Sequence, residues 1–356
     1  MVTATPLISV IVPVYNSGAY LRVCLDSLVA QDAESIEFVC IDDGSTDGSP
    51  AELDAQAAAD SRFRVIHQEN GGYGKAMNVG LAAARGAYIG IVEPDDWVEP
   101  DMFSTLQRLL EGANADIAKV GYTEESEKKT KIECKYAPYA EGTVLPPVEL
   151  PEVLERGISI WCGLYRRDLL ERHAIRFSET PRASFQDLGF GMRTWAYARS
   201  IVVSPRTMYH YRVDNPNSSE RRKEEGAWAI MRELELQQDL FDAIPSEDRL
   251  RRSLLLRRAF HSFLYNYRWR LFDTLRKFLP KFAILLRKLC PFSDLLPEAF
   301  SNNEWHDLQL LYSYPLMYPA KRRCGVTFLQ KLFFIRREGG KVVLRFRRKR
   351  LALRRN

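Results

Sequence analysis

Short apolar runs rich in β-branched residues alternate with helical patterns over the first 120 positions of the chain. Residues 7–14 and 36–41 are almost continuously apolar, which is typical of strands buried on both faces. The other expected strands are 63–66, 87–92 and 116–120, and the expected helices are 19–30, one beginning near Ser49, 75–84 and 101–111. This alternation predicts an α/β fold in which helices flank a mostly parallel sheet.

The chain beyond residue 120 is less regular. Residues 121–150 are polar and contain several prolines, so we expect a loop excursion without chemistry there. Strands are expected at 158–165 and 201–212, with a helix at about 187–198 between them, and the pattern becomes helical from about Lys223. The predicted organisation is a folded domain over 1–215, divided near residue 120, and a helical, basic C-terminal region over 216–356.

The last third of the chain is strongly basic. Residues 251–356 contain 25 Lys and Arg but six Asp and Glu, a net charge of +19, whereas the preceding 250 residues carry −14. This asymmetry indicates an anionic partner surface, either a membrane or a nucleic acid. Aromatic residues of the region, such as Tyr265 and Trp269, stand among leucines at helical spacing, which favours packing or membrane contact. We therefore expect an anionic membrane surface as partner and no nucleic acid.

The cysteines and the N-terminal residues indicate the cellular compartment of the protein. The six cysteines form neither a C-x-x-C pair nor a zinc-ligand spacing, so a reducing compartment is expected. The first residues lack a signal-peptide pattern, and no uninterrupted run of 18 apolar residues occurs. We expect a cytoplasmic protein, peripheral on the inner face of the cell membrane.

Two pairs of aspartates follow predicted strands. Asp42 and Asp43 end one strand, and Asp95 and Asp96 follow another. In parallel sheets ligands bind beyond the carboxyl ends of the strands, so both pairs are expected at one edge. Carboxylates gathered there repel one another unless a cation joins them, and Mg²⁺ or Mn²⁺ prefers such oxygen ligands. The alternative is that these are turn and helix-capping aspartates.

Several segments carry a family resemblance by their order and spacing. They are Pro13-Val14-Tyr15-Asn16, Ile41-Asp42-Asp43-Gly44-Ser45-Thr46-Asp47, Asn70-Gly71-Gly72 with Ala76-Met77-Asn78-Val79-Gly80, and Gly86-Ala87-Tyr88-Ile89 before Asp95-Asp96-Trp97. Over about residues 6–215 the chain resembles the family 2 glycosyltransferases. The resemblance implies a GT-A fold with a nucleotide-binding half (1–120) and an acceptor half (121–215). It also implies inverting, metal-dependent transfer from a nucleotide-diphosphate sugar to a saccharide or lipid-linked acceptor in cell-surface polysaccharide or glycolipid synthesis.

The resemblance also assigns roles to residues of the donor site. Asp42 or Asp43 resembles the acidic contact to the base, Asp95 the ribose contact and Asp96 the ligand of Mg²⁺ or Mn²⁺, while Pro13, Val14 and Asn16 line the nucleotide pocket. The chain departs from the pattern at Glu93, where relatives often carry Asp, and at Met77, where many carry Arg. Lys75 is therefore the candidate for a phosphate contact. Arg212 after the strand 201–212 is a candidate for holding the diphosphate, and the part of Glu93 or His210 in a metal site is open.

The catalytic base is expected in the acceptor half. Inverting transfer needs a carboxylate that takes the proton of the acceptor hydroxyl. The segment Ser184-Phe185-Gln186-Asp187-Leu188-Gly189-Phe190 resembles the acidic motif of the family, so Asp187 is the candidate base. The alternative is that Asp187 caps the helix that follows.

Two other classes of function stay open. One is another nucleotide-binding α/β enzyme, but no G-x-G-x-x-G follows the first strand, and Glu69 and Ala76 break a P-loop pattern. The other is a non-catalytic protein that binds a nucleotide sugar on the same fold. The presence of both Asp96 and Asp187 favours the enzyme.

Overall fold

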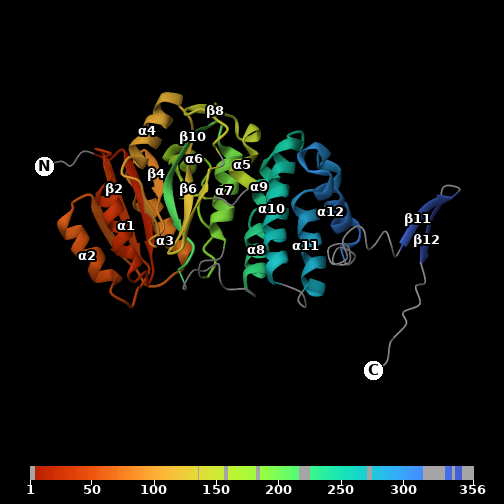
Figure 1. The fold of residues 1–356 in the computed structure, drawn as a ribbon, viewed down its shortest axis with the longest axis horizontal. Helices are drawn as coiled ribbons and strands as arrows, with labels where there is room; N and C mark the ends of the chain where they lie inside the picture. Colours follow the sequence, from red (N-terminus) through yellow and green to blue (C-terminus); the bar gives the residue numbers. More distant parts are fainter. Residues whose placement is uncertain are drawn as a thin grey trace, which may run out of the picture. The chain divides into compact units, whose positions relative to one another are not determined.

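The computed structural model describes residues 5–134, 136–155, 159–181, 185–215, 225–270, 275–315, 333–338 and 341–346. The chain divides into two compact units, Met1–Arg270 and Leu271–Asn356. The first unit holds the sheet and its flanking helices (Figure 1).

The first half of this unit alternates strands and helices as predicted. The elements are β1 (Ile8–Val14), α1 (Tyr20–Val29), β2 (Ile36–Asp42), α2 (Ser49–Ala59), β3 (Phe63–His67), α3 (Tyr73–Ala83) and β4 (Tyr88–Ile91). Neighbours in the order β3-β2-β1-β4 pair in parallel. Because Val14 of β1 is in register with Asp42 of β2, the polar residues that follow these strands meet at one edge.

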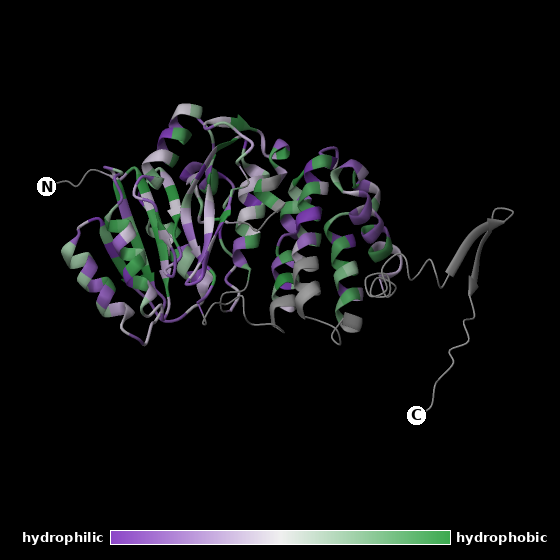
Figure 2. Ribbon diagram, viewed as in Figure 1, coloured by the Kyte–Doolittle hydropathy of each residue, from purple (hydrophilic) through white to green (hydrophobic). Residues whose placement is uncertain are grey.

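The burial of β1 and β2 explains why their sequences are almost continuously apolar. Every residue of both strands is buried, and the strands appear as hydrophobic ribbons inside the unit in Figure 2. Val10 and Val12 join a core with Leu21 and Leu25 of α1. Residues of β2 that point the other way pack with Ala76 of α3. The two-residue period of a strand thus gives each face its own helices.

The second half of the unit is a mixed sheet. Its elements are β5 (Trp97–Val98), α4 (Met102–Ala113), β6 (Ile117–Ser126), β7 (Lys129–Glu133), β8 (Thr143–Leu145), η1 (Pro147–Glu149), α5 (Pro151–Glu155), β9 (Gly163–Arg166), α6 (Arg167–Arg172), α7 (Gln186–Tyr197) and β10 (Ile201–Arg212). β9 runs antiparallel between β4 and β6, whereas β10 is parallel to β6 and antiparallel to β5. The last residues of β10, immediately before Val213, therefore lie near the end of β4.

The loop predicted for 121–150 is wrong in part. β6 continues to Ser126 and pairs with β7 as a hairpin, and β8 adds to β10. Lys131 on β7 forms ion pairs with Glu124 on β6 and with Glu133. The Lys131–Glu124 pair crosses the two strands, and such pairs stabilise a polar, exposed hairpin that leaves no apolar alternation in the sequence.

Helices continue the first unit beyond residue 215. They are α8 (Glu225–Glu235), α9 (Gln238–Ala243) and α10 (Arg249–Arg270), and α8 contacts both α7 and α10. The run Leu254-Leu255-Leu256 on α10 is buried. The compact unit therefore includes helices that the sequence assigns to the C-terminal region, and the functional division at residue 215 stays a prediction.

The second unit begins with helices. It contains α11 (Leu275–Leu289), η3 (Phe292–Asp294), η4 (Pro297–Ala299) and α12 (Asn302–Ser313), and α11 packs against α12. Further along, β11 (Phe333–Glu338) and β12 (Lys341–Phe346) form a hairpin where the sequence pattern predicts helix. Within the part of the chain that the structure describes, no helix combines the length and apolarity that a membrane crossing needs.

Candidate active site

The loops after β1 and β2 are tied together at the carboxyl edge of the sheet. Val14 is buried and its carbonyl oxygen accepts a hydrogen bond from the N–H of Asp43 at 2.9 Å; Pro13 is also buried. Asn16 has φ +50°, a left-handed conformation that turns the chain sharply. Its N–H donates to Ser45 Oγ at 3.0 Å, and its Oδ1 accepts from the Thr46 N–H at 2.7 Å. Three of the predicted pocket residues thus build one rigid edge.

The Asp42 carboxylate is held on both oxygens. Ser45 N–H donates to Oδ1 at 3.0 Å, and His67 Nδ1 lies 2.8 Å from Oδ2. Burial disfavours the ionised form of Asp42 and by itself would raise its pKa. The hydrogen bonds from His67 and Ser45 favour the ionised form more strongly, so the pKa of Asp42 lies below its usual value. The same contact, together with Asp54, raises the pKa of His67.

The Asp43 carboxylate organises the loop that leads into α3. It accepts hydrogen bonds from Gln68 Nε2 at 2.6 Å and from the N–H groups of Gly71 and Gly72 at 2.8 and 2.9 Å. Gly72 needs its φ of +86° to present this N–H, and a side chain would strain the turn. Both Asp42 and Asp43 are buried and shape their loops, so a contact of either with a base stays a prediction.

Lys75 is exposed in the first turn of α3. Its aliphatic stem lies over Gly71, where any Cβ would overlap it. The ammonium group is therefore carried at the rim of the Asp43 loop. A cation at the N-terminus of a helix favours phosphate there, which agrees with the predicted role of Lys75.

Three carboxyl groups gather after β4. Asp96 is fully buried, and its oxygens accept from Tyr209 Oη at 2.7 Å and from the Arg212 N–H at 2.8 Å. Tyr73 Oη donates to Glu93 Oε1 at 2.6 Å, and Asp95 Oδ2 accepts from Asn215 Nδ2 at 2.9 Å.

The pKa values of Asp96 and Glu93 are both raised. Burial and then the charge of Asp95 raise the pKa of Asp96 well above its usual range. Burial raises the pKa of Glu93 to about 8 against the hydrogen bond from Tyr73, and the charges of Asp95 and Asp187 add to the shift. A cation near these groups would relieve the mutual repulsion.

A divalent cation fits this edge only with the help of a ligand. In the described parts of the chain, no three His, Cys, Asp or Glu side chains are arranged to hold a metal by themselves. Asp95 is half-buried, whereas Asp96 is buried and already accepts two hydrogen bonds. Mg²⁺ is often bound by one or two carboxylates and completed by substrate phosphates, and this carboxylate pair matches that pattern. Asp96 as the ligand stays a prediction.

Arg212 lies beside the aspartate pair. Its Nε donates to the Asp95 carbonyl oxygen at 2.9 Å, and its guanidinium lies 4.9 Å from the ring centre of Trp97 and 4.8 Å from that of Tyr20. His210 stacks on Trp97, and its Nε2 is 2.9 Å from Glu99 Oε1. The structure thus brings Arg212 to the predicted diphosphate region and gives His210 a carboxylate partner.

Asp187 lies in the first turn of α7, where the helix N-terminus favours negative charge. The N-cap residue is Phe185, with φ +65°, so Asp187 is not itself the N-cap residue. The charge of Asp187 contributes to the raised pKa values of Glu93 and Tyr73, which places it within electrostatic reach of the end of β4. The predicted base therefore lies near enough to Glu93 and Tyr73 to affect their ionisation.

Several residues of this arrangement carry no local sequence signal. Tyr209 accepts from the N–H of Glu93 at 3.1 Å while it donates to Asp96, and so joins two of the carboxyl residues. Tyr73 also donates to Glu93, Asn215 donates to Asp95, and Glu233 of α8 lies within electrostatic reach of Asp187. These partners stand far from one another along the chain, so only the fold reveals them.

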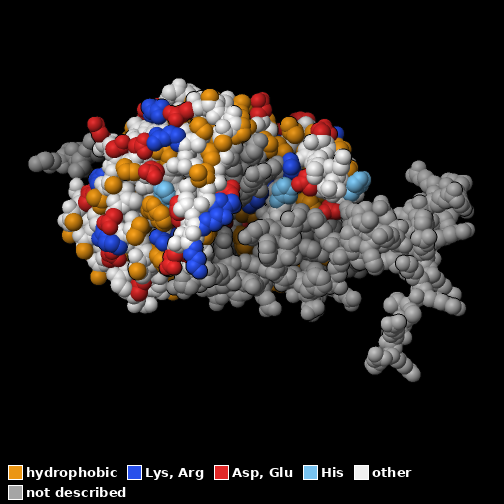
Figure 3. Space-filling view, in the orientation of Figure 1, with side chains coloured by type: hydrophobic (Ala, Val, Ile, Leu, Met, Phe, Trp, Pro, Cys, Tyr) orange, Lys and Arg blue, Asp and Glu red, His pale blue; other side chains and the backbone are white. Residues whose placement is uncertain are grey.

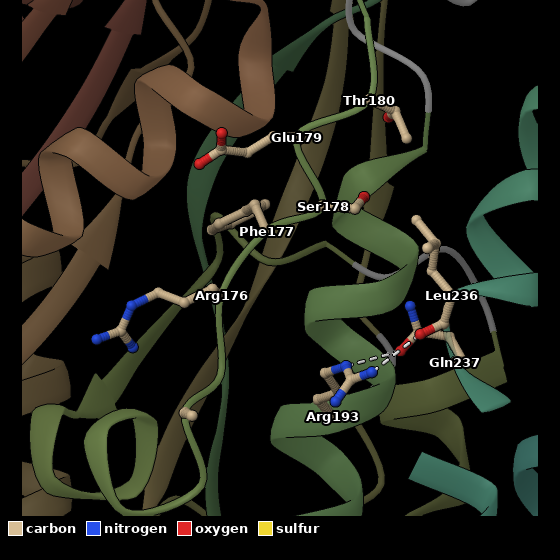
Figure 4. A pocket seen from close by; sticks show the side chains of 9 residues that line it. Arg176, Phe177, Ser178, Glu179, Thr180, Arg193, Leu236 and Gln237 are labelled. Carbon is tan, nitrogen blue, oxygen red and sulfur yellow. Dashed lines mark hydrogen bonds between the residues drawn. The ribbon is translucent and has the colours of Figure 1, made fainter. Parts of the chain in front are cut away.

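A cavity of about 440 Å³ lies beside α7. In Figure 4 it runs along the segment 176–180, with Arg193 of α7 and the chain at Leu236 and Gln237 on the other side. Arg193 Nε donates to Gln237 Oε1 at 2.8 Å across this wall. On the face of the first unit seen in Figure 3, Lys and Arg side chains alternate with Asp and Glu, without a field of one sign.

Comparison with solved structures gives the class of fold. The chain superposes on Staphylococcus aureus TarS 1–349 in complex with UDP-GlcNAc with a TM-score of 0.71, over 96% of this chain and 97% of that one, at 19% identity. The architecture is thus the GT-A type of α/β fold, as predicted.

Sequence relatives then give the family. The model of glycosyl transferase family 2 matches residues 9–173. Glycosyltransferase GlyG of Streptococcus pneumoniae serotype 4 is 32% identical over 58% of this chain and 70% of its own length. The chain belongs to glycosyl transferase family 2. It spans 61% and 62% of EpsH and EpsJ of Bacillus subtilis strain 168, whose names class them as glycosyltransferases and which are each 37% identical to it.

Proposed function

We propose that this protein transfers a sugar from a nucleotide-diphosphate donor to an acceptor hydroxyl with inversion of configuration. The observation that carries the proposal is that Asp187 on α7 lies within electrostatic reach of Glu93 at the end of β4, in a chain of family 2. The donor lies along the loops after β1, β2 and β4, with Asp95 toward the ribose and Lys75 and Arg212 toward the diphosphate.

In the proposed reaction Asp187 takes the proton of the acceptor hydroxyl. The freed oxygen forms a bond to the anomeric carbon while the bond from that carbon to the diphosphate oxygen breaks. The nucleoside diphosphate leaves with the electron pair. Asp187 suits this role because it is a carboxylate whose charge reaches Glu93 at the proposed donor site.

A divalent cation, Mg²⁺ or Mn²⁺, would be held by Asp96 with Asp95 nearby and would neutralise charge on the diphosphate. Arg212 and Lys75 supply further positive charge at the same place. The raised pKa values of Asp96 and Glu93 support this role, because an added cation stabilises both groups in the ionised form.

The acceptor is a saccharide or a lipid-linked saccharide, in the synthesis of a cell-surface polysaccharide or glycolipid. The last third of the chain supports the lipid-linked case, because the net charge of +19 over residues 251–356 attracts anionic headgroups of a cytoplasmic membrane face. Docking would rest mainly on these cations, because the leucine run of α10 and residues such as Phe282 and Leu286 of α11 are buried.

A panel of UDP-, GDP-, ADP- and dTDP-sugars, each with Mg²⁺ or Mn²⁺, tests the proposal. Release of the nucleoside diphosphate from one donor is expected, and excess chelator or Asp96→Asn should abolish most of it while thermal unfolding stays cooperative. Release that continues undiminished in chelator removes the metal from the mechanism. Binding of a nucleotide sugar without any turnover, with or without saccharide acceptors, would instead favour the non-catalytic binding protein.

A further inference from the structure

The segment Phe177–Glu179 joins the donor side of the site to the acceptor side. Asn78 of α3 accepts from the Phe177 N–H at 2.9 Å, and its Nδ2 donates to the Phe177 carbonyl oxygen at 2.9 Å. A Cβ on Gly74 of α3 would overlap the Ser178 carbonyl oxygen, so helix and segment are in close backbone contact. The ring of Phe177 also stacks on Phe190 of α7, with ring centres 4.3 Å apart.

Glu233 of α8 meets the same segment from the other side. Its side chain accepts the hydroxyl hydrogen bond of Ser178, and its Oε1 accepts from Gln237 Nε2 at 3.1 Å. A Cβ on Gly189, two residues after Asp187, would overlap Glu233 Oε1 and Gln237 Nε2. The carboxyl group therefore occupies the space beside the helix backbone that a glycine at 189 leaves open.

Stability alone does not account for a carboxyl group at this position. Glu233 is 1% exposed, and burial raises its pKa to about 7, while the charge of Asp187 adds to the shift. A buried carboxyl group destabilises a fold relative to an apolar side chain of similar size. Both of its hydrogen-bond donors, Ser178 and Gln237, line the cavity beside α7 (Figure 4). Glu233 thus fixes a wall of the acceptor side and the backbone next to the base.

We propose that Glu233 is a positioning residue, which through Ser178 and the Gly189 backbone holds Asp187 at its working distance from the donor helix α3. This inference rests on the proposed function, since it assumes that Asp187 is the base. It also means that the helices after residue 215 complete the acceptor side of the site.

The test measures turnover and donor binding separately in the full chain, with the best donor of the panel and its nucleoside diphosphate as probes. Glu233→Ala should lower kcat for donor turnover by about tenfold or more, because small displacements of a reacting group have large effects on rate. The Kd of the nucleoside diphosphate should stay within about twofold, as the donor loops are untouched. Glu233→Gln keeps an acceptor for Ser178 and should restore most of the rate.

Two further variants separate positioning from folding. Glu235→Ala, at an exposed site on the same helix, is the matched control and should behave as the wild type. Ser178→Ala should lower kcat in the same direction, and the double variant Ser178→Ala/Glu233→Ala should be no slower than Glu233→Ala, because the two residues act as one unit. If Glu233→Ala does not fold, the kcat of Ser178→Ala is used to test the inference.

Three results would overturn the inference. The first is a wild-type kcat in Glu233→Ala. The second is a loss of kcat and of donor affinity that is as large in Glu233→Gln as in Glu233→Ala. The third is a wild-type kcat in Ser178→Ala. Failure of the proposed function looks different, because then the unaltered chain releases no nucleoside diphosphate from any donor, or Asp187→Asn does so at the full rate.

Discussion

Asp187 and the carboxyl groups after β4 are the residues on which the proposed transfer reaction depends. The paired aspartates were predictable because each pair follows a strand, and strand ends of a parallel sheet meet at one edge. The hydrogen-bond partners of Asp96 were not, since Tyr209 and Arg212 arrive on β10 from more than a hundred residues away. Glu233 had no signal at all, because its helix is amphipathic and a glutamate there resembles any surface residue.

Replacing the proposed base should separate catalysis from binding. Asp187→Asn should lower the transfer rate by about 10²-fold or more, the usual contribution of a general base, while donor affinity stays nearly unchanged. Steady-state turnover and calorimetric titration with the nucleoside diphosphate measure the two quantities. A collapse of donor affinity would move Asp187 into the donor site and leave the base unassigned.

The contact of His67 with Asp42 should make stability depend on pH. The folded-state pKa of His67 is raised, so its contribution is complete below the unfolded value of about 6.5 and is lost as pH rises through the folded value. The pKa of Asp42 is lowered, so its contribution is lost as pH falls below about 3.8. His67→Gln should therefore lower Tm by about 1–3 °C near pH 5.5, since exposed pairs contribute about 1 kcal/mol at most.

Calorimetric melting of the wild type and His67→Gln at about pH 5.5 and pH 9 measures this difference. The gap in Tm should narrow at the higher pH, where His67 is neutral in the folded state as well. A gap of the same size at both values would show that the charge of His67 does not stabilise the fold.

Helices and strands of the donor half follow the sequence largely because β1, β2 and β4 are buried on both faces. The predicted bounds of β1, β2 and β3 agree with the structure to within a residue, and α3 begins at Tyr73, two residues before the predicted start. The hairpin β6–β7 was missed because ion pairs such as Lys131–Glu124 stabilise it without apolar alternation. The β11–β12 hairpin was missed because Arg and Lys around apolar runs fit an amphipathic helix equally well.

The close approach of α3 to the segment at Ser178 should be intolerant of a single methyl group. Gly74→Ala places a Cβ against the Ser178 backbone carbonyl, which cannot rotate away, and should destabilise the protein by about 1–3 kcal/mol. Gly112→Ala on α4 is the matched control, since nothing lies within 4 Å of the added carbon. It should be neutral or stabilise the helix by about 0.5–1 kcal/mol. Urea unfolding measures both, and equal effects of the two substitutions would disprove the close contact.

Across the full chain, an acidic N-terminal part precedes a basic C-terminal part. This asymmetry was visible in the sequence, with −14 over the first 250 residues and +19 over the rest. The packing of the apolar runs could not be predicted from the sequence, because buried and lipid-facing leucines have the same spacing along a helix. Burial of Leu255 and Leu286 leaves the cations as the main attraction for a membrane.

Membrane docking should therefore be electrostatic. The full chain should co-sediment with vesicles of anionic phospholipid, release at high salt and ignore neutral vesicles, because each basic residue contributes about 1 kcal/mol near an anionic surface. A variant with Arg336, Arg337, Lys341 and Arg345 of the β11–β12 hairpin changed to Gln should bind at least about tenfold more weakly. Its donor turnover in solution should equal that of the wild type. Equal binding of both proteins, or salt-resistant binding, would contradict docking through these cations.

The central claim is that a nucleotide-diphosphate sugar binds at the carboxyl edge formed by β1, β2 and β4. Backbone hydrogen exchange of the full chain, with and without the nucleoside diphosphate of the best donor and Mg²⁺ or Mn²⁺, tests it most directly. We predict protection of the loops at 14–18, 43–48, 68–75 and 93–97, with the exposed hairpin at 126–133 unchanged. Protection confined to other parts of the chain, or none at saturating nucleotide, would contradict the account.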